Sequence, residues 1–160
     1  FKKYGNQIVR NAKSLAKELI KEGVDLIGKG TENHMMLADL TKTNGAGSGI
    51  LVQDTLGYIG ITVNKNTIPM EPSSPFYPTG IRIGTPALTS RGMKETHMKK
   101  IAKWIGAVIK IVGRVELPLS KEERSSYFKS RRDELAKSKE LQKIWTEVRA
   151  FASRFPVPGI

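Results

Sequence analysis

One stretch of the sequence reads Gly80-Ile81-Arg82-Ile83-Gly84-Thr85-Pro86-Ala87-Leu88-Thr89-Ser90-Arg91-Gly92, a short apolar strand pattern interrupted by an arginine. Ile81 and Ile83 recur with the period of a β-strand, and a glycine stands at each end of that strand. Successive side chains of a strand point to opposite faces, so burial of the two isoleucines turns Arg82 to the other face. The glycines leave room for another group to approach the backbone closely.

Arg82 is the candidate binding residue of this stretch. An arginine held on a rigid strand can grip a planar carboxylate through two parallel hydrogen bonds. The alternative is a solvated arginine on the outer face of an edge strand. The stretch by itself leaves both interpretations open.

The composition limits the classes of protein to consider. With 160 residues the chain is long enough for one domain with its own core and too short for two. The absence of cysteine excludes disulfides, zinc–thiolate sites and cysteine nucleophiles. No apolar run reaches the roughly 18 to 20 residues that cross a bilayer, and no cleavable leader pattern follows Phe1. We therefore expect no membrane partner and a cytoplasmic protein, and we expect residues 1–160 to be a piece of a longer chain.

The net charge of +12 raises nucleic acid as a possible partner. The basic residues are spread along the chain, and acidic residues are interleaved with them as on mixed helix surfaces. No aromatic residues are interleaved in the manner that stacks bases. A non-catalytic basic module that binds RNA or DNA is thus an alternative that charge alone motivates.

Hydrophobic periodicity predicts the elements around the arginine strand. A 3.6-residue period predicts helices over 3–22, 50–56, 94–112 and 121–154, the last with Ser120 and Glu123 as a capping box. Short apolar runs predict strands over 24–27, 35–40 and 59–63, and four prolines make the segment over 64–78 a stiff, irregular loop. The residues expected on the buried helix faces are Ile8, Val9, Ala12, Leu15, Ala16, Leu19, Ile20, Ile50, Leu51, Leu56, Ile101, Trp104, Ile105, Val108, Ile109, Val112, Leu141, Ile144, Trp145, Val148, Phe151 and Phe155.

This order of elements predicts an α/β (α+β) sandwich, a small mixed or antiparallel sheet with helices mainly on one face. The remaining polar residues carry weaker expectations. Arg91 is expected to pair or cap near the start of the helix over 94–112, and His97 is expected to be solvated. His34, beside a strand, is interpreted as a structural hydrogen-bonding residue and not as a catalytic one.

Several motifs, taken in order, carry a family resemblance. They are Gly30-Thr31-Glu32-Asn33-His34 running into Leu37-Ala38-Asp39-Leu40, Ile61-Thr62-Val63-Asn64-Lys65-Asn66 with Pro69, Gly80 to Ala87 with Arg91-Gly92, an opening with Tyr4, Gln7, Asn11-Ala12 and Leu15-Ala16, and a closing Phe155-Pro156-Val157. Together they resemble the carboxy-terminal small domain of serine hydroxymethyltransferase. The resemblance spans nearly the whole chain and is weakest over 110–142.

The resemblance implies a fold, an activity and two site residues. The family belongs to the aspartate-aminotransferase-like (fold type I) pyridoxal phosphate enzymes. Its members interconvert serine and glycine and pass a one-carbon unit to tetrahydrofolate. Residues 1–160 would form a single domain, the small one, of a homodimer or homotetramer. Arg82 matches the arginine that holds the amino-acid carboxylate, and Asn66 matches an asparagine whose amide meets the folate.

The same resemblance implies what this chain lacks. The catalytic residues and the cofactor-binding residues belong to the large domain of the family, so none is expected here, and no metal is expected. The isolated chain is expected to be inactive. Lys29, Glu32 and Glu71 depart from the residues usual in the family, Glu71 standing where an aspartate is common. For Asn64 and Asn66, the alternative to a folate role is that they are simple turn residues.

Overall fold

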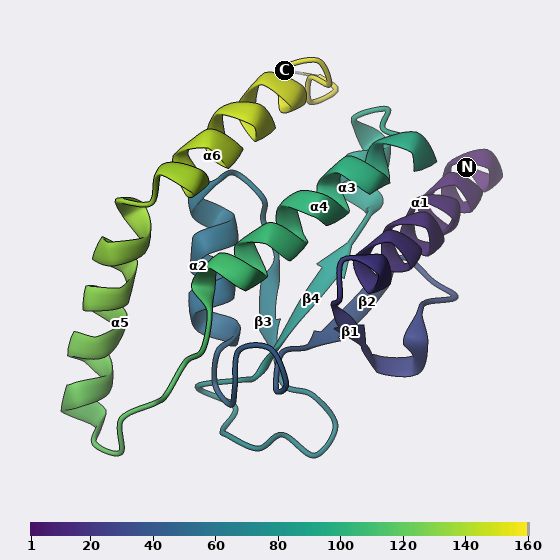
Figure 1. The fold of residues 1–160 in the computed structure, drawn as a ribbon. Helices are drawn as coiled ribbons and strands as arrows, with labels where there is room; N and C mark the ends of the chain where they lie inside the picture. Colours follow the sequence, from purple (N-terminus) through teal and green to yellow (C-terminus); the bar gives the residue numbers. More distant parts are fainter. Residues whose placement is uncertain (160) are drawn as a thin grey trace.

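The computed structural model describes residues 1–159, which form six α-helices, one 3₁₀ turn and four strands (Figure 1). In chain order these are α1 (Lys2–Lys21), β1 (Asp25–Leu26), η1 (Ile27–Lys29), β2 (Met35–Asp39), α2 (Gly49–Tyr58), β3 (Asn64–Asn66), β4 (Gly80–Gly84), α3 (Pro86–Ser90), α4 (Glu95–Val112), α5 (Lys121–Ala136) and α6 (Lys139–Ala152).

The four strands form one antiparallel sheet in the order β1-β2-β4-β3. The arginine strand β4 is therefore interior, because β2 pairs with one of its edges and β3 with the other. Arg82 lies opposite Leu37 of β2 and opposite Asn64 of β3. The sheet is thus antiparallel, as one of the two predicted forms, and the predicted α/β sandwich is confirmed.

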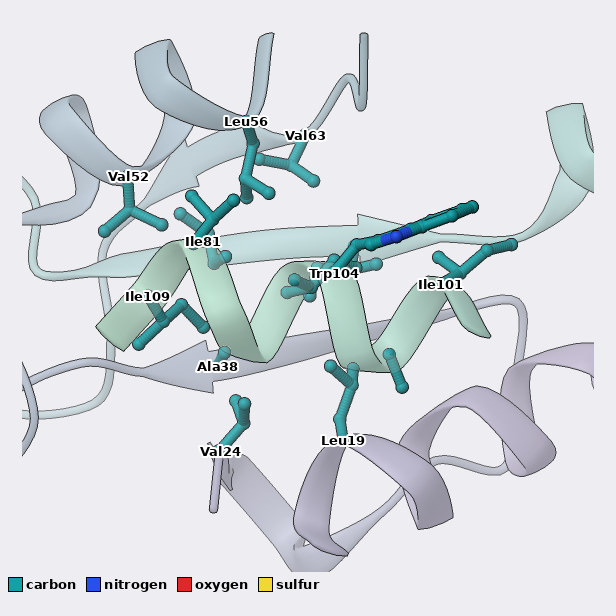
Figure 2. Close-up of a cluster of buried hydrophobic side chains, with 14 of the residues drawn as sticks. Leu19, Val24, Ala38, Val52, Leu56, Val63, Ile81, Ile101, Trp104 and Ile109 are labelled. Atoms are coloured by element: carbon teal, nitrogen blue, oxygen red, sulfur yellow. The ribbon is translucent and has the colours of Figure 1, made fainter. Parts of the chain in front are cut away.

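Helices α1 and α4 pack side by side over one face of the sheet, and α2, α5 and α6 follow the side where β3 lies (Figure 1). Ile81 of β4 and Ala38 of β2 point into the core toward α4, where Trp104 and Ile109 meet them (Figure 2). The face predicted for α4 is confirmed: Ile101, Trp104, Ile105, Val108, Ile109 and Val112 are all buried. Within residues 1–159, no helix covers the opposite face of the sheet (Figure 1).

The strand predicted over 59–63 is wrong. Helix α2 runs on to Tyr58, and Gly60, with φ of +89°, ends it while the amide of Ile61 donates to the carbonyl of Leu56. This closure is the glycine-terminated helix end that leaves one residue in the left-handed region. Ile59 and Val63 are buried as the pattern suggested, but they flank a turn, and the strand begins only at Asn64.

The long helix predicted over 121–154 is two helices. Ser120 begins the first, as predicted, and its hydroxyl accepts a hydrogen bond from the amide of Glu123. Ser138 begins the second by accepting from the amide of Leu141, which allows the chain to change direction between α5 and α6. The buried face of α6 is otherwise as expected at Leu141, Ile144, Val148 and Phe151.

Three further expectations are corrected. Trp145, expected in the core, is 40% exposed on α6, and Ile20, expected on the buried face of α1, is 42% exposed. The predicted strand over 24–27 is shorter than expected, because β1 ends at Leu26 and the chain turns into η1. The buried face of α1 differs from the predicted one in part because two polar residues, Gln7 and Asn11, are buried on it.

Candidate functional site

The open face of the sheet presents Arg82. Ile81 and Ile83 are buried, Arg82 is exposed, and the predicted alternation across β4 is therefore confirmed. Its guanidinium forms no ion pair among the residues that the structure describes. A cation fixed on an interior strand and left without a counter-ion is available to an anionic ligand.

Gly80 explains how the strands come close enough to build this face. A Cβ at this position would lie 2.8 Å from the carbonyl oxygen of Ala38 and 2.9 Å from that of Asn66. The close approach predicted for the flanking glycines thus exists here, and the approaching groups are the backbones of both neighbouring strands. Any larger residue would push β2 or β3 away from β4.

A hollow of about 380 Å³ lies on this open face. Arg82 and Asn66 both line it, together with Leu37 and the turn that precedes β2. The structure therefore brings together the two predicted binding residues, which lie 16 residues apart in the sequence. Glu32, the one carboxylate in the lining, is paired with Lys13 at 2.5 Å.

Asn66 is the last residue of β3, opposite Gly80. The interpretation of Asn64 and Asn66 as simple turn residues is wrong, since both pair with β4. One N–H of the Asn66 amide donates to the carbonyl of Thr67 at 2.7 Å. This bond orients the amide plane, and an amide carries a donor and an acceptor side by side.

The turn before β2 is held by its own side chains. The side-chain oxygen of Asn33 accepts from the amide of Met35 at 2.9 Å, and the hydroxyl of Thr31 donates to the carbonyl of Met35. His34 contributes its backbone carbonyl, which accepts from the amide of Thr85. Its side chain is exposed, and the view of His34 as a structural residue stays a prediction.

Glu71 organises the proline-rich loop 67–79, which connects β3 to β4. Its carboxylate accepts from the amides of Ile68, Ser73 and Thr79 at 3.2, 3.1 and 3.0 Å, and from the hydroxyl of Thr79. Burial raises the pKa of the Glu71 carboxyl, but the hydrogen bonds from Thr79, Ile68 and Ser73 outweigh that effect and hold it below its ordinary value of 4.5.

The role of Glu71 was not predicted from the sequence, which marked the residue only as a departure from the family pattern. A signal was present, because a carboxylate among prolines, serines and threonines is a common acceptor for loop amides. The partners could not be named, since Thr79 lies eight residues further on and its approach depends on the path of the loop.

Arg91 and His97 make structural contacts near the end of α6. The Arg91 side chain donates to the carbonyls of Phe155 and Ala152 at 2.6 and 2.8 Å, so it caps the end of α6, whereas the start of α4 was expected. His97, expected to be solvated, is partly buried, and its ring meets the ring of Phe155 edge-on at 4.8 Å.

Within residues 1–159 there is no group of three or more histidine, aspartate or glutamate side chains that could hold a metal ion. None of the helices over the same residues has the length and apolar character needed to cross a membrane.

Comparisons with known proteins agree with this geometry. A family model described as serine hydroxymethyltransferase matches residues 1–105, which include the sheet, the hollow and the loop that carries Glu71. The chain belongs to the serine hydroxymethyltransferase family.

Two curated relatives, both named serine hydroxymethyltransferase, extend this match. One, from Methanospirillum hungatei, is 54% identical over 110 residues, which are 69% of this chain and 26% of the relative. The other, from Acidothermus cellulolyticus, is 41% identical over 160 residues, which are 100% of this chain and 33% of the relative. The chain therefore spans about a quarter to a third of the curated relatives it matches. Neither match supports the alternative of a nucleic-acid-binding module.

Proposed function

We propose that this chain is the carboxy-terminal small domain of a pyridoxal phosphate-dependent glycine hydroxymethyltransferase. The complete enzyme would interconvert serine and glycine and transfer a one-carbon unit to tetrahydrofolate, as the family resemblance implies. The family membership supports this proposal, and so does the fraction of each relative that the chain covers. A cytoplasmic homodimer or homotetramer is part of the same proposal.

Arg82 would hold the carboxylate of the amino-acid substrate. The observation that carries this role is its position on the interior strand β4. The guanidinium has no ion pair within residues 1–159, and Arg82 is exposed on the sheet face that the helices of those residues leave uncovered. A guanidinium forms two parallel hydrogen bonds to a carboxylate, so it fixes the orientation of an amino acid as well as its charge. Orientation matters because the substrate bond that reacts must be aligned with the groups that act on it.

Asn66 would meet the folate. Asn66 lines the hollow that Arg82 also lines, and a ring that offers a complementary acceptor and donor suits a side-chain amide. Placing both residues in one hollow supports a site where the amino acid and the one-carbon acceptor lie near each other. The stiff loop 67–79 would then form one wall of the folate pocket.

The residues of this chain do not by themselves fit pyridoxal phosphate. The hollow contains a single arginine and no lysine, so it lacks the amine that would bind the cofactor aldehyde. We therefore assign the cofactor to the large domain of the family, and assign to residues 1–160 only substrate orientation. Cofactor chemistry would be completed where the two domains meet.

The roles of Arg82 and Asn66 can be separated in the complete enzyme. Arg82→Ala should weaken serine binding by about 100-fold or more, since it leaves a carboxylate unpaired in a desolvated site. Asn66→Ala should weaken tetrahydrofolate binding and leave serine binding nearly unchanged. Calorimetric titration with each ligand would measure both affinities.

Asn64→Ala is the matched control, because Asn64 lies on the same strand and the same sheet face but does not line the hollow. It should change neither affinity more than about twofold. Normal serine affinity in Arg82→Ala would overturn the carboxylate role, and equal loss of folate affinity in Asn64→Ala and Asn66→Ala would overturn the folate role.

A further inference from the structure

We infer that Glu71 is a positioning residue that fixes loop 67–79 and through it orients the Asn66 amide, which donates to the carbonyl of Thr67 in that loop. This inference rests on the function proposed above and adds a residue that determines the affinity for folate. The loop joins the end of β3, where Asn66 lies, to the start of β4, two residues before Arg82. The path of the loop therefore connects the two proposed ligand-binding side chains.

The carboxylate of Glu71 holds both ends of this loop at once. Near β3 it accepts from the amide of Ile68, two residues after Asn66, and near β4 it accepts from the amide and hydroxyl of Thr79, three residues before Arg82. A third amide, from Ser73, comes from the middle of the loop. The pairing of Asn66 with Gly80 already brings the two ends together, and this one side chain ties the loop residues beyond that pair to each other.

Thr79 carries the same restraint into the body of the fold. Its hydroxyl oxygen accepts from the amide of Gly47, and the amide of Gly49, the first residue of α2, donates to the carbonyl of Pro78. Thr79 is fully buried. The loop end at β4 is therefore attached to α2, and Glu71 connects the other end to this fixed point.

Apolar packing accounts for only part of the order in this loop. Ile68 and Pro78 at its ends are buried, but Met70 is 98% exposed and Phe76 is 80% exposed. Tyr77 stacks on Phe128, and the four hydrogen bonds to the charged Glu71 carboxylate add a second restraint on the intervening residues. Bonds to charged groups are stronger than neutral ones. Removing the charge should loosen the loop without opening the core.

The test uses Glu71→Gln, Glu71→Asp and Glu116→Gln in the complete enzyme. Glutamine keeps the size of the Glu71 side chain but replaces one accepting oxygen with an N–H group, which cannot accept from the loop amides. Aspartate keeps the negative charge on a shorter side chain. Glu116, in the exposed segment after α4, is the control carboxylate. Amide hydrogen exchange without ligands would report loop order, and steady-state kinetics would give KM for tetrahydrofolate and for serine.

We expect Glu71→Gln to speed exchange in loop 67–79 by about tenfold relative to α4, and to raise KM for tetrahydrofolate by about tenfold. KM for serine should stay within about twofold, because Arg82 is held by β2 as well as by the loop. Glu71→Asp should lie between Glu71→Gln and the unchanged protein, and Glu116→Gln should match the unchanged protein.

Unchanged exchange in Glu71→Gln would overturn the inference, and so would a looser loop with unchanged KM for tetrahydrofolate. Equal increases in both KM values would overturn it too, because they would indicate a general structural defect. Failure of the proposed function would look different: Asn66→Ala would then bind folate normally, while the exchange rates, measured without ligand, would still report whether Glu71 orders the loop.

Discussion

On one face of β4, Ile81 and Ile83 are buried beneath the helices, whereas on the other face Arg82 is exposed beside a hollow of about 380 Å³. The buried face is packed by apolar side chains from α1, α2 and α4 (Figure 2). The open face presents the Arg82 guanidinium and Asn66, and the loop that follows Asn66 is held in place by a carboxylate. Substitutions on the first face should therefore change stability, and substitutions on the second should change binding.

The largest expected effect comes from Ile81→Ala. Ile81 is fully buried, so truncation should lower the free energy of unfolding by about 2 to 5 kcal/mol through lost apolar burial and a cavity. Its neighbour offers the contrast: Arg82→Ala should change that free energy by no more than about 0.5 kcal/mol. Urea unfolding of both variants would measure the difference, and comparable losses would contradict the division between the two faces.

A smaller loss is expected from Gly80→Ala, which affects both faces at once. The added methyl group would meet the carbonyl oxygens of Ala38 and Asn66 at 2.8 and 2.9 Å, so strand spacing must increase. Overpacking of this kind costs about 1 to 3 kcal/mol. Gly57→Ala, in α2 where an added Cβ meets nothing within 4 Å, is the control and should not destabilise. Thermal unfolding would measure the midpoints of the two variants. Equal midpoints would contradict the claim that a Cβ at position 80 clashes with the neighbouring strands.

The smallest effect expected on the open face is a pH dependence. Because hydrogen bonds hold the pKa of Glu71 below 4.5, its stabilising contribution is complete above that value and is lost as the pH falls through the lowered pKa. The stability difference between the unchanged protein and Glu71→Gln should thus be constant from pH 7 to about pH 5 and should shrink below pH 4.5. Urea midpoints of both proteins across this range would measure it, and a difference that grows in acid would contradict the assignment.

Periodicity predicted much of the fold but not its interruptions. The stripes of α1 and α4 are long enough for the 3.6-residue period to be unambiguous, and alternation around Arg82 gave the orientation of β4. The strand predicted over 59–63 was wrong because Ile59 and Val63 fit two patterns. A helix that ends at a glycine and a short strand both place apolar residues two to four positions apart. The break at Ser138 was hidden inside a continuous charged helical pattern.

The site was predicted less completely than the fold. Strand alternation singled out Arg82 as a candidate, and the family resemblance favoured that role and added Asn66. Their common position in one hollow depends on the register of β3 against β4, which the sequence does not specify. Glu71 and Arg91 depend on partners eight and more than 60 residues away. Such contacts follow from the tertiary path of the chain, so local pattern does not reveal them.

The affinity of the complete enzyme for serine with Arg82→Lys is the most direct test of the open face. Lysine keeps the positive charge and fits an exposed strand position, but it cannot form two parallel hydrogen bonds to one carboxylate. We expect serine to bind at least about tenfold more weakly, with the free energy of unfolding unchanged. Equal affinity for serine in Arg82→Lys and in the unchanged enzyme would contradict the proposal that this guanidinium holds the substrate carboxylate.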